Sequence, residues 1–291
     1  MIGFTLSFDG YDASENKLEF YDAAQAMLGF QRTLALTTHL VLNGEVITQA
    51  PSLKDAQIFV VPPREGSWEI ATIISLSAVV LYKLGTAPRE TPLGNLVCSA
   101  YDYIISETLG FHVDYEKTLG KQYEELSADR KNKIPLLDQS NFDSVIEKCE
   151  KAVRDMHRPI VKSTSAERAN IYYETDDDSF SLGHALTSRT YEYINETIVD
   201  ESREIISGKV SSYNINTYKG RIYIIDEKRP VPFELSHEAR NARSVGRIVE
   251  SLRLNAIDRK RDDAIVSFRV YKHRSVTDRL KSVFVLAILN E

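Results

Sequence analysis

The sequence predicts an α+β protein with a helix-rich N-terminal part that contains a small sheet, and a C-terminal small bent β-sheet or barrel with one helix. A chain of 291 residues is long enough for two ordinary domains. Apolar residues recur at helical spacing over much of the first half, whereas short runs of β-branched and aromatic residues dominate after residue 204. A composition of 43% apolar and 27% charged residues is typical of an ordered globular chain.

Charge divides the chain in the same way as the predicted elements. Residues 202–291 carry 18 of the 36 Lys and Arg but only 11 of the 42 Asp and Glu, so their net charge is +7 and that of residues 1–201 is −13. We therefore expect an acidic helix-rich α+β domain at 1–165, a connecting segment at 166–202 and a basic β-rich domain resembling a small barrel at 203–291. Such asymmetry suggests that the two parts meet different partners or neutralise one another.

The N-terminal part begins with a predicted strand at 3–8, followed by an Asp9-Gly10 turn. A long helix is predicted from about 20 to 42, ending at Asn43-Gly44, because glycine readily takes the left-handed conformation at a helix C-terminus. The strands 57–61 and 68–73 should form a hairpin, since the prolines between them cannot continue a helix.

Residues 70–82 carry no charge but span only 13 residues, fewer than the roughly 20 that a membrane-crossing helix needs. They predict a core helix around 74–84, and a membrane partner is not expected. Further helices are predicted at 93–107, 114–126 and 141–156, and a strand or edge segment is predicted around Tyr191, Tyr193 and Ile198. The N-terminus has no secretory signal pattern, which predicts a cytoplasmic protein.

The C-terminal part predicts three strands, at 205–215, 221–225 and 230–235, then a helix at 238–252 with Ser236 as its N-cap. Two more strands, 264–271 and 282–289, complete the pattern. Residues 208–222 resemble the opening strands of OB-like and SH3-like small barrels. That resemblance implies a fold often used to bind nucleic acids or peptides.

No cofactor and no catalytic residue set is predicted. The sequence has no glycine-rich nucleotide motif and no nucleophile elbow, and its six histidines lack the spacing of metal ligands. The acidic run 174–178 lacks the alternate ligands of a calcium loop, and Asp226-Glu227-Lys228 is best interpreted as a polar turn. Cys98 and Cys149 lie in apolar helical patterns, which predicts buried thiols.

The strongest functional signal is a series of cations in the last third of the chain. Arg240, Arg243 and Arg247 recur at helical spacing and should share one helix face. Together with residues of the following loop and hairpin, they form the predicted anion- or partner-binding set: Arg240, Arg243, Arg247, Arg253, Arg259, Lys260, Arg261, Arg269, Lys272 and Arg274.

Such a surface would suit phosphates, and Tyr213, Tyr218 and Tyr223 could stack on bases if exposed. The alternative is that the cations neutralise the acidic first part across an interdomain or subunit interface. Asp258, Asp262, Asp263 and Asp278 dilute the positive charge and weaken the nucleic-acid interpretation.

Over its whole length the chain resembles a bacterial family of unknown function that is carried on genomic islands. The resemblance rests on the Phe8-Asp9-Gly10 turn, on the hairpin sequence of residues 60–69, Val-Val-Pro-Pro-Arg-Glu-Gly-Ser-Trp-Glu, and on a final module like residues 208–235. It implies a bacterial source and a role in host or phage defence, and it transfers no catalytic residue.

Three classes of function follow from these observations. The first is a non-catalytic interaction or assembly protein that binds a protein partner or itself, with the apolar segments 74–84 and 93–107 contributing a buried surface. The second is a nucleic-acid-binding module acting through the basic C-terminal domain. The third is a membrane-acting effector, or an enzyme whose site leaves no local motif.

Overall fold

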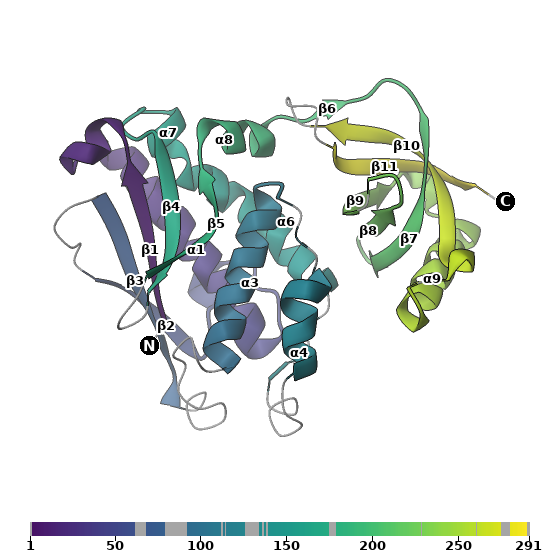
Figure 1. Ribbon diagram of the computed structural model, residues 1–291, viewed down its shortest axis with the longest axis horizontal. Helices are drawn as coiled ribbons and strands as arrows, with labels where there is room; N and C mark the ends of the chain where they lie inside the picture. The colour runs from purple at the N-terminus through teal and green to yellow at the C-terminus, as the bar shows by residue number, and fades with distance from the viewer. Residues whose placement is uncertain are drawn as a thin grey trace. The chain divides into compact units, whose positions relative to one another are not determined.

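The chain forms two compact units, each with a hydrophobic core of its own. The computed structural model describes residues 2–61, 68–78, 92–111, 113, 115–125, 134–135, 137, 139–174, 179–227, 229–259, 261–274 and 280–289. Unit 1 comprises Met1–Ile194 and unit 2 comprises Asn195–Glu291. Helices and a sheet in unit 1 and a barrel in unit 2 make this an α+β protein, as predicted (Figure 1).

Unit 1 contains a five-stranded antiparallel sheet with the strand order β2-β3-β1-β4-β5. Its strands are β1 (Ile2–Asp9), β2 (Ala56–Val61), β3 (Trp68–Leu76), β4 (Arg168–Glu174) and β5 (Ser179–Leu186). Side chains alternate between the two faces of a strand, so Phe4, Leu6 and Phe8 of β1 enter the core while Ser7 and Asp9 lie on the opposite face. We call this opposite face the outer face of the sheet.

Helices α1 (Phe20–Asn43) and α3 (Pro92–Thr108) pack against this sheet, and α6 (Gln139–Met156) packs against both helices (Figure 1). Helix α1 ends as predicted, because Gly44 takes a φ of 70° and donates its backbone N–H to the Leu40 carbonyl. Helices α1 and α6 approach closely at Gly29, where a Cβ atom would lie 2.3 Å from the Ala152 carbonyl oxygen. A larger residue at this position would push the two helices apart.

Shorter elements complete unit 1: the 3-10 turns η1 (Tyr11–Glu15) and η2 (Ala50–Ser52), the π-helical turn η3 (Glu116–Gly120), and the helices α4 (Lys121–Glu125), α7 (Arg158–Val161) and α8 (Ser188–Asn195). Both cysteines are buried free thiols, as predicted. Burial raises the pKa of the Cys149 thiol to about 12. At neutral pH this cysteine is therefore an uncharged core side chain.

Two predicted elements of unit 1 have a different form in the structure. Residues 68–76 continue as strand β3, so the helix expected at 74–84 does not begin at Ile74, and its part from residue 79 lies outside the described residues. An unbroken apolar run fits a buried strand as well as a buried helix, and pairing with β1 and β2 selects the strand. The segment 166–202, expected to connect the two parts, contains β4, β5 and α8, and Tyr191 and Tyr193 lie in that helix.

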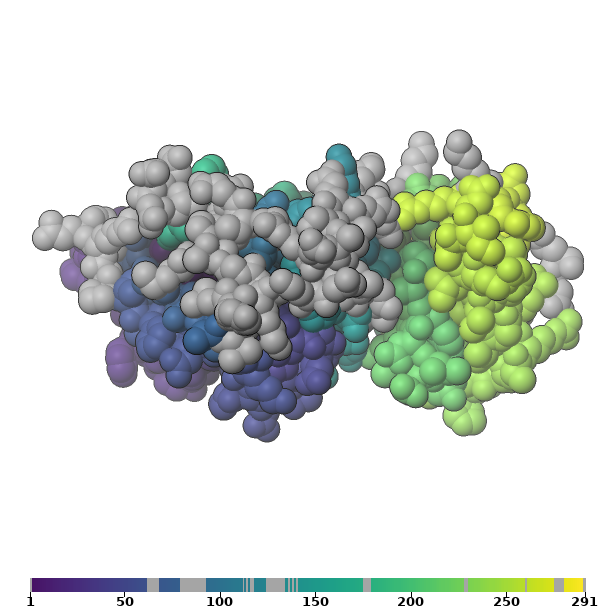
Figure 2. Space-filling model, turned by 90° about the horizontal axis from the view of Figure 1, so that it is seen from below, coloured from purple at the N-terminus to yellow at the C-terminus, as the bar shows by residue number. Residues whose placement is uncertain are grey.

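Unit 2 is built around a closed five-stranded barrel with the cyclic order β7-β8-β9-β11-β10. Its strands are β7 (Glu204–Asn214), β8 (Lys219–Ile224), β9 (Arg229–Leu235), β10 (Ile265–Arg274) and β11 (Leu280–Leu289). Only the β9–β11 pair is parallel among the described strands of the barrel, and the short strand β6 (Ile198–Val199) extends β10. Figure 2 shows these residues packed into one continuous body, coloured green to yellow.

A three-stranded meander, a helix and a final hairpin that closes the ring together make the topology of an OB-type barrel. The helix is α9 (Ala242–Ile257), with a short 3-10 turn η5 (Asp262–Ala264) after it. Its start differs from the prediction, because Ser236 caps a separate 3-10 turn, η4 (His237–Ala239), and Asn241 caps α9 by accepting the Ser244 N–H at 3.0 Å. Arg240 therefore lies between the two elements instead of on the helix.

Within the part of the chain that the structure describes, no helix combines the length and the apolar character that crossing a bilayer requires. Helix α3, whose apolar sequence suggested a buried surface for assembly, is largely enclosed by the core of unit 1. That segment is therefore occupied by intramolecular packing.

Candidate partner-binding site

A pocket of about 200 Å³ lies beside the first two turns of α9 in unit 2. Arg243 and Arg247 of α9, Glu238 of η4 and residues 286–288 of β11 are among the residues that line it. We call it the arginine pocket. Arg243 and Arg247 are four positions apart on one helix, so both guanidinium groups lie on the same face.

Arg269 adds a third cation beside this pocket. Its register partner on β11 is Ala287, which lines the pocket, and directly opposed residues of an antiparallel pair point to the same face of a sheet. None of the three arginines has an ion pair or a side-chain hydrogen bond among the described residues, and all three are exposed. The structure thus places two guanidinium groups on the pocket and a third arginine on the strand that pairs with its β11 segment.

Most of the other predicted site residues are neutralised within unit 2. Arg253 binds both carboxylate oxygens of Glu250, at 2.9 and 2.7 Å. The other pairs are Arg261 with Asp263 (2.8 Å), Lys272 with Glu204 (2.6 Å), Arg274 with Asp200 (2.9 Å) and Arg240 with Glu234 (3.5 Å). A guanidinium or ammonium group that is already paired with a carboxylate binds a second anion only weakly. These five residues therefore form a weak anion-binding surface.

Arg240 corrects a specific expectation, because it does not share a face with Arg243 and Arg247. Its guanidinium stacks 4.9 Å above the Tyr218 ring and donates to the Leu235 carbonyl at 3.1 Å. Arg259 is exposed, and its carbonyl accepts a hydrogen bond from the Lys209 ammonium at 2.8 Å. Lys260 lies outside the described residues.

The three tyrosines proposed as base-stacking residues also separate. Tyr213 packs against the barrel core, with its ring stacked on Phe233 at 6.2 Å, and Tyr218 packs against the same core beneath Arg240. Tyr223 alone of the three is exposed, with 42% of its surface accessible. A platform of several aromatic rings is therefore not formed by these residues.

The carboxylate of Glu238 reduces the positive charge of the arginine pocket. Its own backbone N–H, followed by the Ser236 hydroxyl, holds the pKa of this carboxyl below its usual range. The side chain is therefore ionised at neutral pH, and the three arginines leave a net positive charge. Sequence reasoning found the arginines but missed the β11 wall, because the contact between α9 and residues 286–288 depends on barrel closure and has no local pattern.

The fold and this site define a two-unit α+β protein whose second unit is an OB-type barrel carrying a cationic pocket. Residues 4–195 match a family model described as "Domain of unknown function (DUF7946)", and residues 202–289 match one described as "Family of unknown function (DUF7947)". The first match covers more than half of the chain, so this protein belongs to the DUF7946 family. The expected membership of a family of unknown function is thereby confirmed, and the two matched ranges follow the two units.

Neither the curated proteins nor the solved structures include a match to this chain.

Proposed function

We propose that this protein is a non-catalytic interaction protein whose barrel binds an acidic side chain of a protein partner in the arginine pocket. The observation that carries this proposal is that Arg243 and Arg247 line one pocket, with Arg269 on the strand paired with its β11 segment, while neighbouring cations are paired within the unit. Guanidinium groups form paired hydrogen bonds with carboxylates, so this arrangement favours an anionic ligand group. A volume of about 200 Å³ suits a single side chain.

Exposed apolar residues of α9 favour a protein partner over a nucleic acid. Val249 and Ile257 are 47% and 63% exposed, so this helix presents apolar as well as cationic groups to solvent. Protein interfaces combine buried apolar contacts with arginine in this way. The outer side of α9 and the arginine pocket together form the proposed docking surface.

Nucleic-acid binding is the second candidate, and the barrel topology favours it because OB-type barrels often bind oligonucleotides. Proteins that bind single-stranded nucleic acids usually hold the phosphate backbone in a continuous basic groove and stack several bases on aromatic side chains. In unit 2, five of the predicted cations are paired with carboxylates, and Tyr213 and Tyr218 pack inward. These pairings make a protein partner the better supported proposal.

The partner could be a second copy of this chain, since residues 1–201 carry a net charge of −13. Opposite charge on the two parts favours contact between one copy's barrel and another copy's first unit. Self-association is therefore one form of the same proposal. A role in bacterial defence stays a prediction from the family resemblance.

A binding experiment with two labelled anions tests the proposal. We expect fluorescence anisotropy to show binding of a glutamate-rich peptide, and at least tenfold weaker binding after Arg243→Glu and Arg247→Glu, because reversed charges repel carboxylates. Tenfold corresponds to about 1.4 kcal/mol. Arg261→Glu is the matched control in the same unit; since Arg261 lies outside α9 and is held by Asp263, binding should change less than twofold.

A single-stranded oligonucleotide of equal charge is the competing probe. Tighter binding of the oligonucleotide, lost in the same double variant, would establish the nucleic-acid alternative instead. Mass in solution measures self-association: an oligomer above the 33.0 kDa chain that dissociates in the double variant supports binding between copies. Peptide binding that survives both charge reversals would overturn the role of the arginine pocket.

A further inference from the structure

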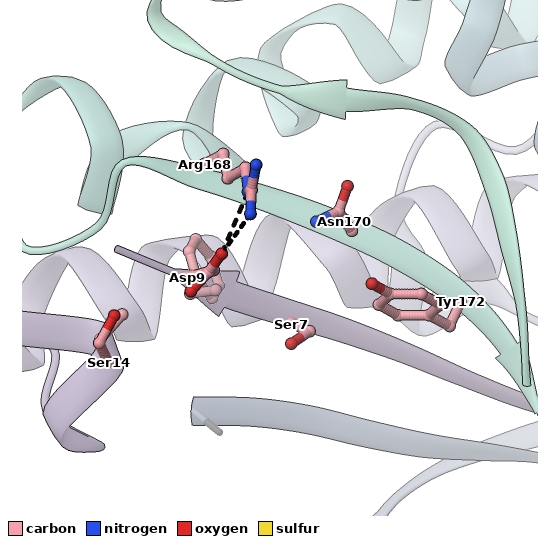
Figure 3. A pocket seen from close by; sticks show the side chains of 8 residues that line it. Ser7, Asp9, Ser14, Arg168, Asn170 and Tyr172 are labelled. Atoms are coloured by element: carbon pink, nitrogen blue, oxygen red, sulfur yellow. Dashed lines mark hydrogen bonds and ion pairs between the residues drawn. The ribbon is translucent and has the colours of Figure 1, made fainter. Parts of the chain in front are cut away.

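A second pocket, of about 320 Å³, lies on the outer face of the sheet in unit 1 (Figure 3). Ser7 and Asp9 of β1 and Arg168, Asn170 and Tyr172 of β4 line it, with η1 supplying Ser14 at one end. We call it the outer-face pocket. Its volume falls at the small end of the range for small-molecule sites, which is about 300–1,000 Å³.

Strand register explains why these side chains gather. Ser7 pairs with Asn170, Asp9 with Arg168 and Thr5 with Tyr172, so the β4 side chains stand in a row on one face. The pocket's end is formed by the chain reversal at Gly10, whose φ of 83° suits glycine. A Cβ atom at Gly10 would lie 2.4 Å from the Glu167 Cβ atom, so this turn also needs the absence of a side chain.

The 3-10 turn η1 is fixed against the sheet end. Ala13 is buried, and its backbone N–H donates to the Ser165 carbonyl at 2.9 Å. This contact holds Ser14 beside the row of β1 and β4 side chains. The pocket is thus a built feature of the fold with walls from three segments of the chain.

The charged groups of the outer-face pocket satisfy one another. The Arg168 Nε and one terminal nitrogen both donate to one Asp9 oxygen, at 3.1 and 2.6 Å (Figure 3). Arg168 holds the pKa of the Asp9 carboxyl below its usual range. Because the pair has no net charge, neither a cation nor an anion gains strong attraction from this site.

Several uncharged polar groups remain available. The Ser14 and Tyr172 hydroxyls and the Asn170 amide have no hydrogen-bond partner among the described residues. Arg168 still has one terminal NH₂ group without a partner in the same part of the chain. These groups together offer both donors and acceptors along the lining of one pocket.

We propose that the outer-face pocket binds a neutral, hydroxyl-rich small molecule of monosaccharide size. Vicinal hydroxyls both donate and accept, and so they match the mixed set of amide, hydroxyl, guanidinium and carboxylate groups. The Tyr172 ring supplies the one sizeable apolar surface among the six labelled side chains, and it can cover one face of a sugar ring (Figure 3). This site lies in unit 1 and is independent of the proposed function of unit 2.

Ligand-observed NMR tests this proposal on the full chain. A panel of free monosaccharides (glucose, galactose, mannose, ribose and N-acetylglucosamine) is examined by saturation transfer. We expect at least one sugar to show transfer, and its titrated affinity to fall at least tenfold in Asn170→Ala and in Tyr172→Ala. Gln57→Ala is the matched control, because Gln57 is exposed on β2 of the same sheet and does not line the pocket.

Salt separates a neutral ligand from a charged one. Sugar binding should change less than twofold between 50 mM and 500 mM NaCl, since no net charge is neutralised. Absence of transfer to every sugar, or equal transfer in Asn170→Ala and wild type, would overturn the proposal. Stronger binding of acetate, inorganic phosphate or glycine than of any sugar would overturn it as well, because it would show that the Asp9–Arg168 pair opens for ions.

Discussion

His157 is a fully buried histidine that links α6 to α8 in unit 1. Its Nδ1 lies 2.7 Å from the Val153 carbonyl, which can only accept, so Nδ1 carries the proton and Nε2 faces the Thr190 hydroxyl at 2.9 Å. Burial lowers the pKa of this imidazole to about 4. The ring is therefore a neutral structural group at physiological pH.

Acid should destabilise unit 1 through this side chain. The unfolded chain takes up a proton below pH 6.5 while the folded chain resists until about pH 4, so stability is lost as pH falls through this window. We expect a loss of about 2 kcal/mol between pH 7 and pH 5. Urea unfolding followed by fluorescence of Trp68, the single tryptophan, measures it in unit 1.

The variant His157→Gln provides the control for this pH dependence. It should be less stable at pH 7, but its free energy of unfolding should fall less between pH 7 and pH 5, since glutamine does not titrate. Some slope remains because burial also lowers the pKa of His39. An unchanged slope in the variant would assign the acid sensitivity to other groups.

At the scale of elements, the surroundings of two helical glycines predict opposite effects when each is replaced by alanine. Gly29 lies at the crossing of α1 and α6, whereas Gly246 lies on an open side of α9. Gly29→Ala places a methyl group 2.3 Å from the Ala152 carbonyl and should destabilise unit 1 by about 1–3 kcal/mol. Gly246→Ala on α9 meets nothing within 4 Å and should stabilise unit 2 by about 0.5–1 kcal/mol, because alanine favours helix.

Chemical denaturation measures both glycine variants, with Trp68 fluorescence for unit 1 and far-ultraviolet circular dichroism for the whole chain. For Gly29→Ala the midpoint of the Trp68 fluorescence transition should fall, and the part of the circular dichroism transition that comes from unit 1 should shift with it. A Gly29→Ala chain as stable as wild type would mean that α1 and α6 separate at little cost. In that case the packing of the two helices would be looser than the contact at Gly29 indicates.

The sequence predicted elements well where the signal is local. The meander strands, the final two strands and the C-terminus of α1 at Gly44 follow from alternation and turn residues. It placed the hairpin of 57–61 and 68–73 correctly, but it began a helix at residue 74 where β3 continues to Leu76, and it expected a strand where the tyrosines of α8 lie. Arg240 illustrates the site: spacing placed it on a helix, but Ser236 caps the start of η4 and Asn241 caps the start of α9, so Arg240 falls between the two elements.

The sequence could not predict which cations of the candidate site form ion pairs with carboxylates. Charge asymmetry predicted a cationic surface, but whether a guanidinium is free depends on which carboxylate the fold brings within about 3 Å. Asp200 and Arg274 meet across 74 residues, and Lys272 and Glu204 across 68. Only Arg243, Arg247 and Arg269 of the predicted set are described and lack such a partner.

At the scale of the whole molecule, separate cores predict that unit 2 folds alone. A fragment of residues 195–291 should be folded, whereas a fragment of residues 203–291 should melt about 5–10 °C lower. The shorter fragment lacks β6 and Asp200, whose carboxylate binds Arg274 at 2.9 Å and whose N–H donates to the Lys272 carbonyl. The partly buried pair and the lost backbone bond are together worth about 1–2 kcal/mol.

Thermal melts by circular dichroism compare the two fragments, with Asp200→Asn in the longer fragment as the control for the ion pair. The melting temperature of the Asp200→Asn fragment should lie between those of the two unsubstituted fragments. Equal melting temperatures for all three would show that β6 and its ion pair add nothing to the barrel. An unfolded 195–291 fragment would show that unit 2 depends on unit 1.

The pairing of β1 with β4 joins chain segments that are very distant in sequence, since Asp9 and Arg168 are 159 positions apart. Closing so long a loop lowers the entropy of the chain before the contacts between the strands stabilise it, and chains rich in such contacts fold slowly. The pairing of β1 with β4 can form only after these two distant segments meet. We therefore expect the outer-face pocket to form late in folding and to be absent from any intermediate in which the helices have formed but the sheet is incomplete.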